Sequence, residues 1–287
     1  MIGKCDEIHV VLHTDDSVSI TDNGRGIPVG EHAEAHKSAL EVVMTTLNAG
    51  GKFDHNSYKV SAGLHGVGVS CVNALSEWTE VEVWSSETGH LHYQRYERGE
   101  PITPVENRGR ADRTGTKVRF KPDPEIFDST TFKFDVIAKR LRELAFLNSG
   151  VRIIIQNQAD EQKDEFYYEG GIAEFVKYLN EGKEPLHPVI HVTGEMDDVI
   201  CEIALQYNDT YNETIFSFAN NINTYEGGTH LSGLRSALTR TMNQYGKEHN
   251  LLKDATPGGQ DYREGLNAVI SVKLPDPQFE GQTKGKL

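Results

Sequence analysis

The sequence predicts an α+β fold in two domains, of which the first is built on a sheet with antiparallel and mixed pairing. Residues 7–13 and 17–21 alternate in polarity around Thr14-Asp15-Asp16, which predicts a β-hairpin. Apolar side chains recur at helical spacing from Phe134 to Ala145. A new series of strand and helix patterns follows Gly170-Gly171. We therefore expect domains at 1–169 and 170–287.

The remaining elements of the first domain follow in chain order. We expect a helix over residues 38–47 and a second helix from Gly66 to near Ser76. Strands are expected at 79–84, 91–96 and 115–120. The helix that starts at Phe134 should end at Asn148-Ser149-Gly150, with Glu143 on its surface side. Strands at 151–155 and 165–168 would complete the sheet.

The second domain begins with a short amphipathic helix, whose apolar stripe is Ile172, Phe175, Val176 and Leu179. Strands are expected at 189–192, 199–207 and 214–219. A long helix should run from 229 to 246, and a last strand over 266–274 should stop at Pro275.

Asp22 closes the strand 17–22 and has the same parity as Val18 and Ile20, so its carboxylate should point to the covered face. Burying an unpaired carboxylate is unfavourable, so a hydrogen-bond donor is needed there. An ionised Asp only accepts, and the amino group of adenine is a suitable donor. Such a bond contributes about 1.5–3 kcal/mol. The alternative is an ordinary turn residue at a strand end.

A glycine-rich run over residues 61–70, SAGLHGVGVS, precedes the second expected helix. Glycine lets the backbone approach a ligand closely, and a helix start offers unpaired N–H groups to an anion. This arrangement predicts a phosphate cradle, although neither a P-loop nor a strand–GxGxxG–helix pattern is present. The alternative is a glycine-rich turn that only packs tightly.

The composition suits a soluble globular protein of 287 residues, with 37% hydrophobic and 25% charged side chains. No apolar run is long enough to span a membrane, and the N-terminal residues do not resemble a signal peptide. The three cysteines are far apart, so we expect buried free thiols in a reducing cytoplasm. Because the net charge is −14, any contact with DNA must come from a local basic patch or from a partner subunit.

Together, the segments DNGRGIP (22–28) and GLHGVGVSCVNALS (63–76) resemble the Bergerat-type ATP site. That GHKL fold is shared by type IIA topoisomerases, heat-shock chaperones of this class, MutL proteins and sensor histidine kinases. Segments at 49–54, 57–61, 114–120 and 139–148 narrow the resemblance to the DNA gyrase B family, with the corresponding component of topoisomerase IV as its close paralogue. The resemblance covers essentially the whole chain, to Gln282-Thr283-Lys284.

The resemblance implies a Bergerat α/β sandwich followed by a transducer domain with a ribosomal S5 domain 2-like fold. It assigns Asp22 to the adenine amino group, with Thr116 joining through water. The other implied ATP-binding residues are Gly24, Arg25, Gly26, Ile27, Pro28, Lys52, Tyr58, Lys59, Gly63, Leu64, His65, Gly66, Val67, Gly68 and Val69. Lys284 of the second domain would reach the γ-phosphate, with Gln282 beside it; the alternative for such lysines is simple solvation.

The implied mechanism uses ATP and Mg²⁺. In the family, ATP binding closes a dimeric gate on a double-stranded DNA segment, and hydrolysis reopens the gate. The implied partner protein is gyrase A. Arg235, Arg240 and Lys247 on the long helix would face the DNA, or form an ordinary solvated face.

The sequence departs from the family pattern at its beginning. The family motif with the general-base Glu and the Mg²⁺-binding Asn should lie just upstream of residue 2, and it is absent here. We therefore expect this chain alone to be a poor or inactive ATPase, and its transducer to be truncated at the C-terminus. The alternative is a nucleotide-binding module without turnover. The sequence does not distinguish gyrase from topoisomerase IV.

Overall fold

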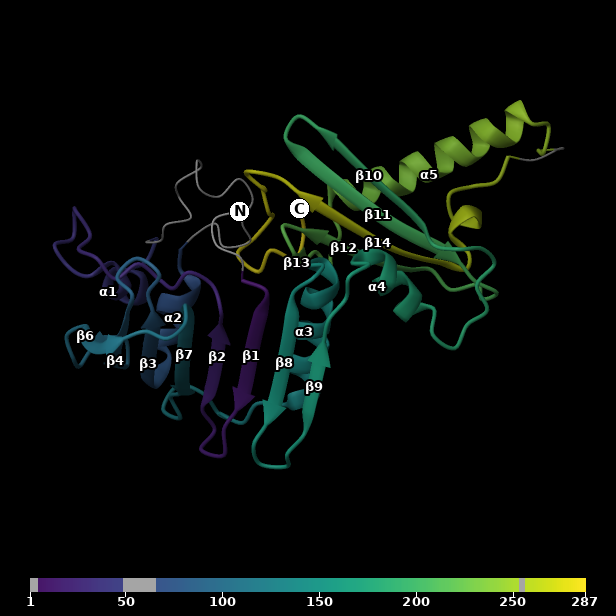
Figure 1. Cartoon of the computed structure of the whole chain (residues 1–287). Helices are drawn as coiled ribbons and strands as arrows, with labels where there is room; N and C mark the ends of the chain where they lie inside the picture. The colour runs from purple at the N-terminus through teal and green to yellow at the C-terminus, as the bar shows by residue number, and fades with distance from the viewer. Residues whose placement is uncertain (1–4, 49–65, 253–255) are drawn as a thin grey trace. The chain divides into compact units, whose positions relative to one another are not determined.

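The structure is a computed structural model that describes residues 5–48, 66–252 and 256–287. It divides into two compact units, with the boundary between Glu169 and Gly170 (Figure 1). Within the described ranges, no helix combines the length and apolar character that crossing a bilayer needs. The predicted segment 49–65, with Lys52, Tyr58, Lys59, Gly63, Leu64 and His65, lies outside the described residues.

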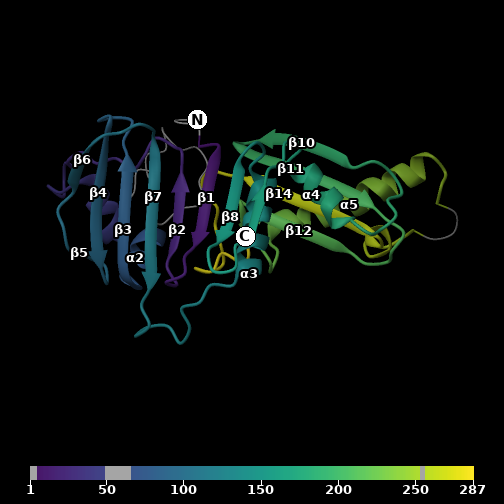
Figure 2. The ribbon, with the colours of Figure 1, turned by 60° about the horizontal axis from the view of Figure 1, so that its bottom comes forward.

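The first unit contains one mixed sheet. Its described strands are β1 (Glu7–Leu12), β2 (Val18–Asp22), β3 (Ser76–Trp84), β4 (His90–Glu97), β5 (Glu100–Pro101), β6 (Glu106–Arg110), β7 (Gly115–Pro122), β8 (Arg152–Asn157) and β9 (Lys163–Phe166). Their order is β5-β4-β3-β7-β2-β1-β8-β9, with β6 paired to β4 (Figure 2). The pairing of β1 with β8 is parallel, whereas the other ladders are antiparallel. The expected hairpin and the expected mixed pairing are confirmed.

Three described helices cover one face of this sheet: α1 (Ala39–Thr45), α2 (Gly68–Ala74) and α3 (Phe134–Leu147). Leu40 and Met44 of α1 are fully buried in a cluster with Val81 and Val83 of β3. On α3, apolar residues pack against β1, β2 and β8 in a second cluster. The opposite face carries cross-strand ion pairs such as Arg95–Glu80 and Lys117–Glu82. The first unit is therefore an α/β sandwich, as the sequence predicts.

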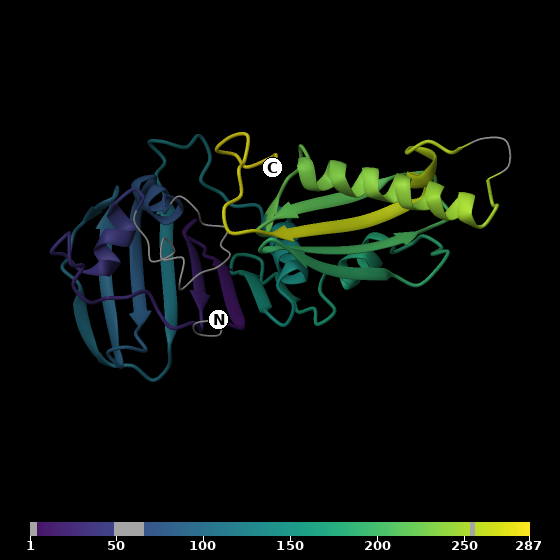
Figure 3. The same ribbon diagram turned by 90° about the horizontal axis from the view of Figure 1, so that it is seen from above.

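The second unit has a five-stranded sheet in the order β10-β11-β14-β12-β13. The strands are β10 (Ile190–Met196), β11 (Val199–Tyr207), β12 (Thr214–Ala219), β13 (Ile222–Asn223) and β14 (Leu266–Lys273). Helix α4 (Ile172–Leu179) places Phe175 against Phe216 and Phe218. Helix α5 (Thr229–Glu248) buries Leu234 against Ile270 and Val272 on the other face (Figure 3). A short 3-10 helix, η2 (Asp261–Arg263), precedes β14.

Several expectations need correction. Glu143 is buried, because its carboxylate accepts a 2.7 Å hydrogen bond from Arg140 one turn away on α3. Cys71 is exposed and Cys5 and Cys201 are half-buried, so the three thiols are free but not buried. Strand β9 lies two residues earlier than predicted, because its register is set by pairing with β8 through Lys163 to Phe166.

Candidate functional site

Asp22 is the last residue of β2 and lies opposite Ile8 of β1 and Thr116 of β7. Its side chain is half-buried, and its Oδ1 accepts a 2.8 Å hydrogen bond from the backbone N–H of Gly24. Burial raises the pKa of this carboxyl, and the backbone amides of Gly24 and Thr116 oppose that rise. The site therefore holds an acid in a weakly hydrated position at the end of two central strands.

Glycines surround Asp22 at positions where side chains have no room. A Cβ on Gly115, whose φ is +141°, would lie 2.0 Å from the carbonyl oxygen of Asp22. A Cβ on Gly26, whose φ is +84°, would lie 3.0 Å from the carbonyl oxygen of Trp84 and from Cγ1 of Val83. L side chains are strained in this left-handed region, so both positions require glycine.

Thr116 connects β7 to the turn that follows Asp22. Its hydroxyl is buried and accepts a 3.2 Å hydrogen bond from the backbone N–H of Ile27. The backbone N–H of Ser86 donates to the carbonyl of Arg25 at 3.1 Å. The turn that carries Gly24, Arg25, Gly26, Ile27 and Pro28 is thus held on β7 and on the end of β3. The structure therefore brings Asp22, Thr116 and this turn together.

An aromatic side chain at the end of β3 pairs with a cation from the segment between β6 and β7. Trp84 is 8% exposed, and the guanidinium of Arg113 lies 3.7 Å from the centre of its ring. Sequence reasoning did not single out Arg113. A cation over an aromatic ring is a stabilising arrangement, and only the folded chain brings these two residues together.

The described part of the glycine-rich run leads into α2. Gly66 has φ +58°, Val67 precedes the helix, and Gly68 is its first residue. The N–H of Cys71 donates to the carbonyl of Val67 at 3.0 Å, which closes the first turn of α2. Gly66, Val67, Gly68 and Val69 therefore form a turn into a helix, as expected. Their contact with phosphate stays a prediction.

Lys284 and Gln282 lie in the second unit, after β14. Lys284 is half-buried with φ +55°, and burial lowers its pKa. The segment that follows is attached to the start of α5, because the N–H of Leu287 donates to the carbonyl of Gly227 and the N–H of Thr229 to that of Leu287. Gln282 is exposed. The γ-phosphate role of Lys284 stays a prediction.

The three cations predicted on α5 differ in their surroundings. Arg235 donates two hydrogen bonds, of 3.1 and 2.7 Å, to Oε1 of Glu213. Arg263 donates to the other oxygen of the same carboxylate. Arg240 and Lys247 are exposed. Arg235 is therefore part of an ion-pair network, and contact of these cations with DNA stays a prediction.

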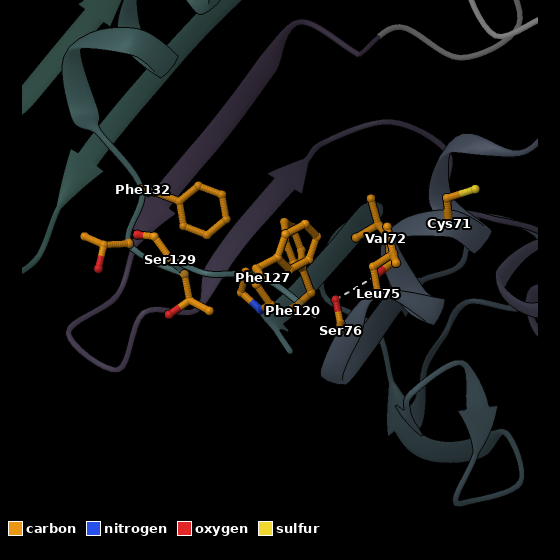
Figure 4. A pocket seen from close by; sticks show the side chains of 11 residues that line it. Cys71, Val72, Leu75, Ser76, Phe120, Phe127, Ser129 and Phe132 are labelled. Atoms are coloured by element: carbon orange, nitrogen blue, oxygen red, sulfur yellow. Dashed lines mark hydrogen bonds between the residues drawn. The ribbon is translucent and has the colours of Figure 1, made fainter. Parts of the chain in front are cut away.

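A separate apolar cavity of about 290 Å³ lies in the first unit, at the far end of β7 from Thr116 (Figure 4). Its walls come from the end of α2, from β7 and from the loop before α3. The lining residues are Cys71, Val72, Leu75, Ser76, Phe120, Pro122, Phe127, Ser129, Thr130, Thr131 and Phe132. None of them is charged, and none belongs to the turn after Asp22, so this cavity is separate from the candidate site.

The described residues do not provide a metal cluster. Within the ranges that the structure describes, no three His, Cys, Asp or Glu side chains gather as metal ligands. Mg²⁺ binds oxygen ligands and in nucleotide sites takes several from phosphates and water. The described side chains therefore do not fit a metal site by themselves.

The fold and the site together identify a class of ATPases. Residues 2–126 match the family of histidine kinase-, DNA gyrase B- and HSP90-like ATPases, and residues 171–287 match the DNA gyrase B family. Among solved structures, the 43K ATPase domain of Thermus thermophilus gyrase B in complex with an aminocoumarin is similar, with a TM-score of 0.81 and 42% identity. That alignment covers 98% of this chain and 73% of the other.

The chain belongs to the DNA gyrase B family. Its sequence is 58% identical over 292 residues to the DNA gyrase B protein of Halalkalibacterium halodurans and 57% identical over 297 residues to that of Thermotoga maritima. Each alignment covers 100% of this chain and 46% of the relative, so the chain spans less than half the length of these relatives. The topoisomerase IV ATP-binding domain of Francisella tularensis is similar at 29% identity and a TM-score of 0.78, covering 98% of this chain and 75% of the other.

Proposed function

We propose that the first unit binds ATP, with Asp22 accepting a hydrogen bond from the adenine amino group. The observation that carries the proposal is the half-buried carboxylate, one oxygen of which is held by the Gly24 amide beside the buried Thr116 hydroxyl. The glycines next to it let the backbone pack closely around the carboxylate, where a side chain would have no room. A carboxylate that only accepts hydrogen bonds selects a base with an exocyclic amino group at that position.

Thr116 contributes through its hydroxyl, which already accepts from Ile27 and retains a proton to donate. In this proposal that proton goes to a water shared by Asp22 and the base. We assign the wall against which the base lies to Gly24, Gly26, Ile27 and Pro28, and the mouth to Arg25 and Lys52. The family resemblance assigns Tyr58 and Lys59 to a lid over the nucleotide.

The proposed phosphate contacts are the backbone N–H groups of residues 63–69. Lys284, with Gln282 beside it, reaches the γ-phosphate from the second domain, 170–287. A contact made to the γ-phosphate alone distinguishes ATP from ADP, which is the differential interaction that a ligand-driven change of state requires. Bound ATP then favours one arrangement of the two domains, and loss of the phosphate releases it.

For the whole protein we propose the activity that its relatives' name implies. It is an ATP-dependent type II DNA topoisomerase that acts with gyrase A on double-stranded DNA, and its ATPase region dimerises when ATP binds. Relatives named DNA gyrase B match the whole chain at 52–58% identity, which favours negative supercoiling. Mg²⁺ would accompany the phosphates. The free thiols are compatible with a location in the cytoplasm.

The test is a calorimetric titration of the chain with the non-hydrolysable analogue AMP-PNP and with GMP-PNP. The proposal predicts binding of the adenine nucleotide and at least about tenfold weaker binding of the guanine nucleotide, which presents a carbonyl in place of the amino group. Equal affinity for both nucleotides contradicts it. Phosphate release from ATP by the same 287-residue chain separates binding without turnover from an active ATPase.

A further inference from the structure

Asn23, the residue between Asp22 and Gly24, makes more hydrogen bonds to the start of β1 than an ordinary turn residue needs. Its Oδ1 accepts from the backbone N–H of Asp6 at 3.0 Å and from that of Glu7 at 3.1 Å. Its Nδ2 donates to Oδ1 of Asp6 at 2.6 Å. Its own backbone N–H donates to the carbonyl of Glu7 at 3.3 Å.

These four bonds continue the β1–β2 pairing beyond the last register pair, Ile8 with Asp22. At this point the Asn23 side chain makes the hydrogen bonds that a strand backbone would otherwise make, because the chain leaves the sheet to form the turn. The amide fits this place, because one oxygen can accept two N–H groups while the nitrogen donates. Alanine would leave the two N–H groups of Asp6 and Glu7 without this acceptor.

The hydrogen bonds of Asn23 affect the carboxylate of Asp22 through the backbone. Asp22 and Gly24 flank Asn23, and the Gly24 amide is the 2.8 Å donor to Asp22 Oδ1. A Cβ on Gly24 would lie 2.9 Å from that oxygen, so the turn packs closely on the carboxylate. A movement of Asn23 therefore changes the direction of the Asp22 side chain.

We infer that Asn23 is a positioning residue that aims the Asp22 carboxylate at the adenine amino group, with Asp6 as its partner. The inference rests on the proposed function of Asp22. It adds Asn23 and Asp6, to which neither the DNGRGIP motif nor the comparisons assign a role. Asn23 itself touches no nucleotide in this account. It acts by fixing the backbone on both sides of its own α-carbon.

The experiment compares two ligands: AMP-PNP and purine riboside triphosphate, which lacks the amino group. Asn23→Ala is expected to weaken AMP-PNP binding by about three- to tenfold, the equivalent of about one hydrogen bond. It leaves the affinity for the purine analogue within about twofold, since that ligand makes no bond to Asp22. A merely structural role would weaken both ligands equally, and that result overturns the inference.

Three further variants sharpen the test. In an Asp22→Asn background, Asn23→Ala is expected to have no additional effect on AMP-PNP affinity, because coupled residues are not additive. Asn23→Asp keeps the acceptor oxygens and places a carboxylate against that of Asp6, so it weakens AMP-PNP binding. Adding Asp6→Lys to it restores an attractive pair and recovers the affinity. Failure of this rescue counts against the Asp6 partnership.

Asn107→Ala is the matched control. Asn107 accepts a 2.9 Å bond from the Gly109 backbone in the same unit, so the control removes a similar turn bond away from Asp22, and it should change neither affinity. Hydrogen exchange of the Gly24 amide tests the positioning without nucleotide. Exchange at least about threefold faster in Asn23→Ala supports it, and unchanged exchange overturns it. If the wild-type chain binds neither ligand, the ATP proposal fails, while the Gly24 measurement still decides whether Asn23 positions the Asp22 carboxylate.

Discussion

Gly26→Ala tests directly whether the turn after Asp22 is as tightly constrained as the structure shows. Gly26 has φ +84°, and a Cβ there would approach the Trp84 carbonyl and Val83 Cγ1 to 3.0 Å and the Gly115 carbonyl to 3.3 Å. The left-handed backbone costs an L residue about 1–2 kcal/mol, and overlap with two fixed carbonyls adds to it. We expect the free energy of unfolding of the first unit to fall by about 2–3 kcal/mol.

The assay is urea unfolding followed by tryptophan fluorescence. The chain has two tryptophans, Trp78 and Trp84, and both lie on β3, so the signal reports the first unit. Gly30→Ala is the matched control, because a Cβ at Gly30 meets nothing within 4 Å and should change the stability by less than about 0.5 kcal/mol. Equal unfolding midpoints for the two variants would refute the reasoning.

Three further predictions follow from individual contacts. Thr116→Val removes the acceptor of the Ile27 amide and should lower the unfolding free energy by about 1 kcal/mol in the same urea assay; an unchanged midpoint would show that this bond contributes nothing. The pKa of Asp15 is about 2, below 3.8, chiefly because of its bond from Ser17, so its stabilisation is complete above pH 3.8 and is lost as the pH falls toward 2. Asp15→Asn should therefore destabilise by about 1 kcal/mol at neutral pH, after discounting for exposure, and the difference should vanish in acid; a difference independent of pH would contradict this. Leu234→Ala should destabilise the second unit by about 2–3 kcal/mol, seen as faster hydrogen exchange in β14, and equal exchange would mean that α5 does not depend on this contact.

Much of the fold could be predicted because the buried strands and helices have clear periodicity. The predicted strands 199–207 and 214–219 coincide with β11 and β12, and the helix that starts at Phe134 ends at Leu147, before Asn148. Strand β10 extends to Met196, past the predicted end at 192, because an exposed edge strand carries no burial pattern to read. Strand β6 (Glu106–Arg110) was missed for the same reason.

The candidate site could be predicted only in part. The spacing of Asp22 and its glycines is visible in the sequence, and the structure places Thr116 opposite Asp22. The Asn23–Asp6 bond and the stacking of Arg113 on Trp84 join residues whose pairing depends on sheet register. Such register follows from the folded sheet and not from local residue pattern.

The most direct test of the central claim is the affinity of Asp22→Asn for AMP-PNP, measured by calorimetric titration beside the wild-type chain. Loss of the charged acceptor should weaken binding by about tenfold to a hundredfold, with an unchanged urea midpoint that shows an intact fold. The same affinity in both proteins would contradict the assignment of Asp22 to the adenine base.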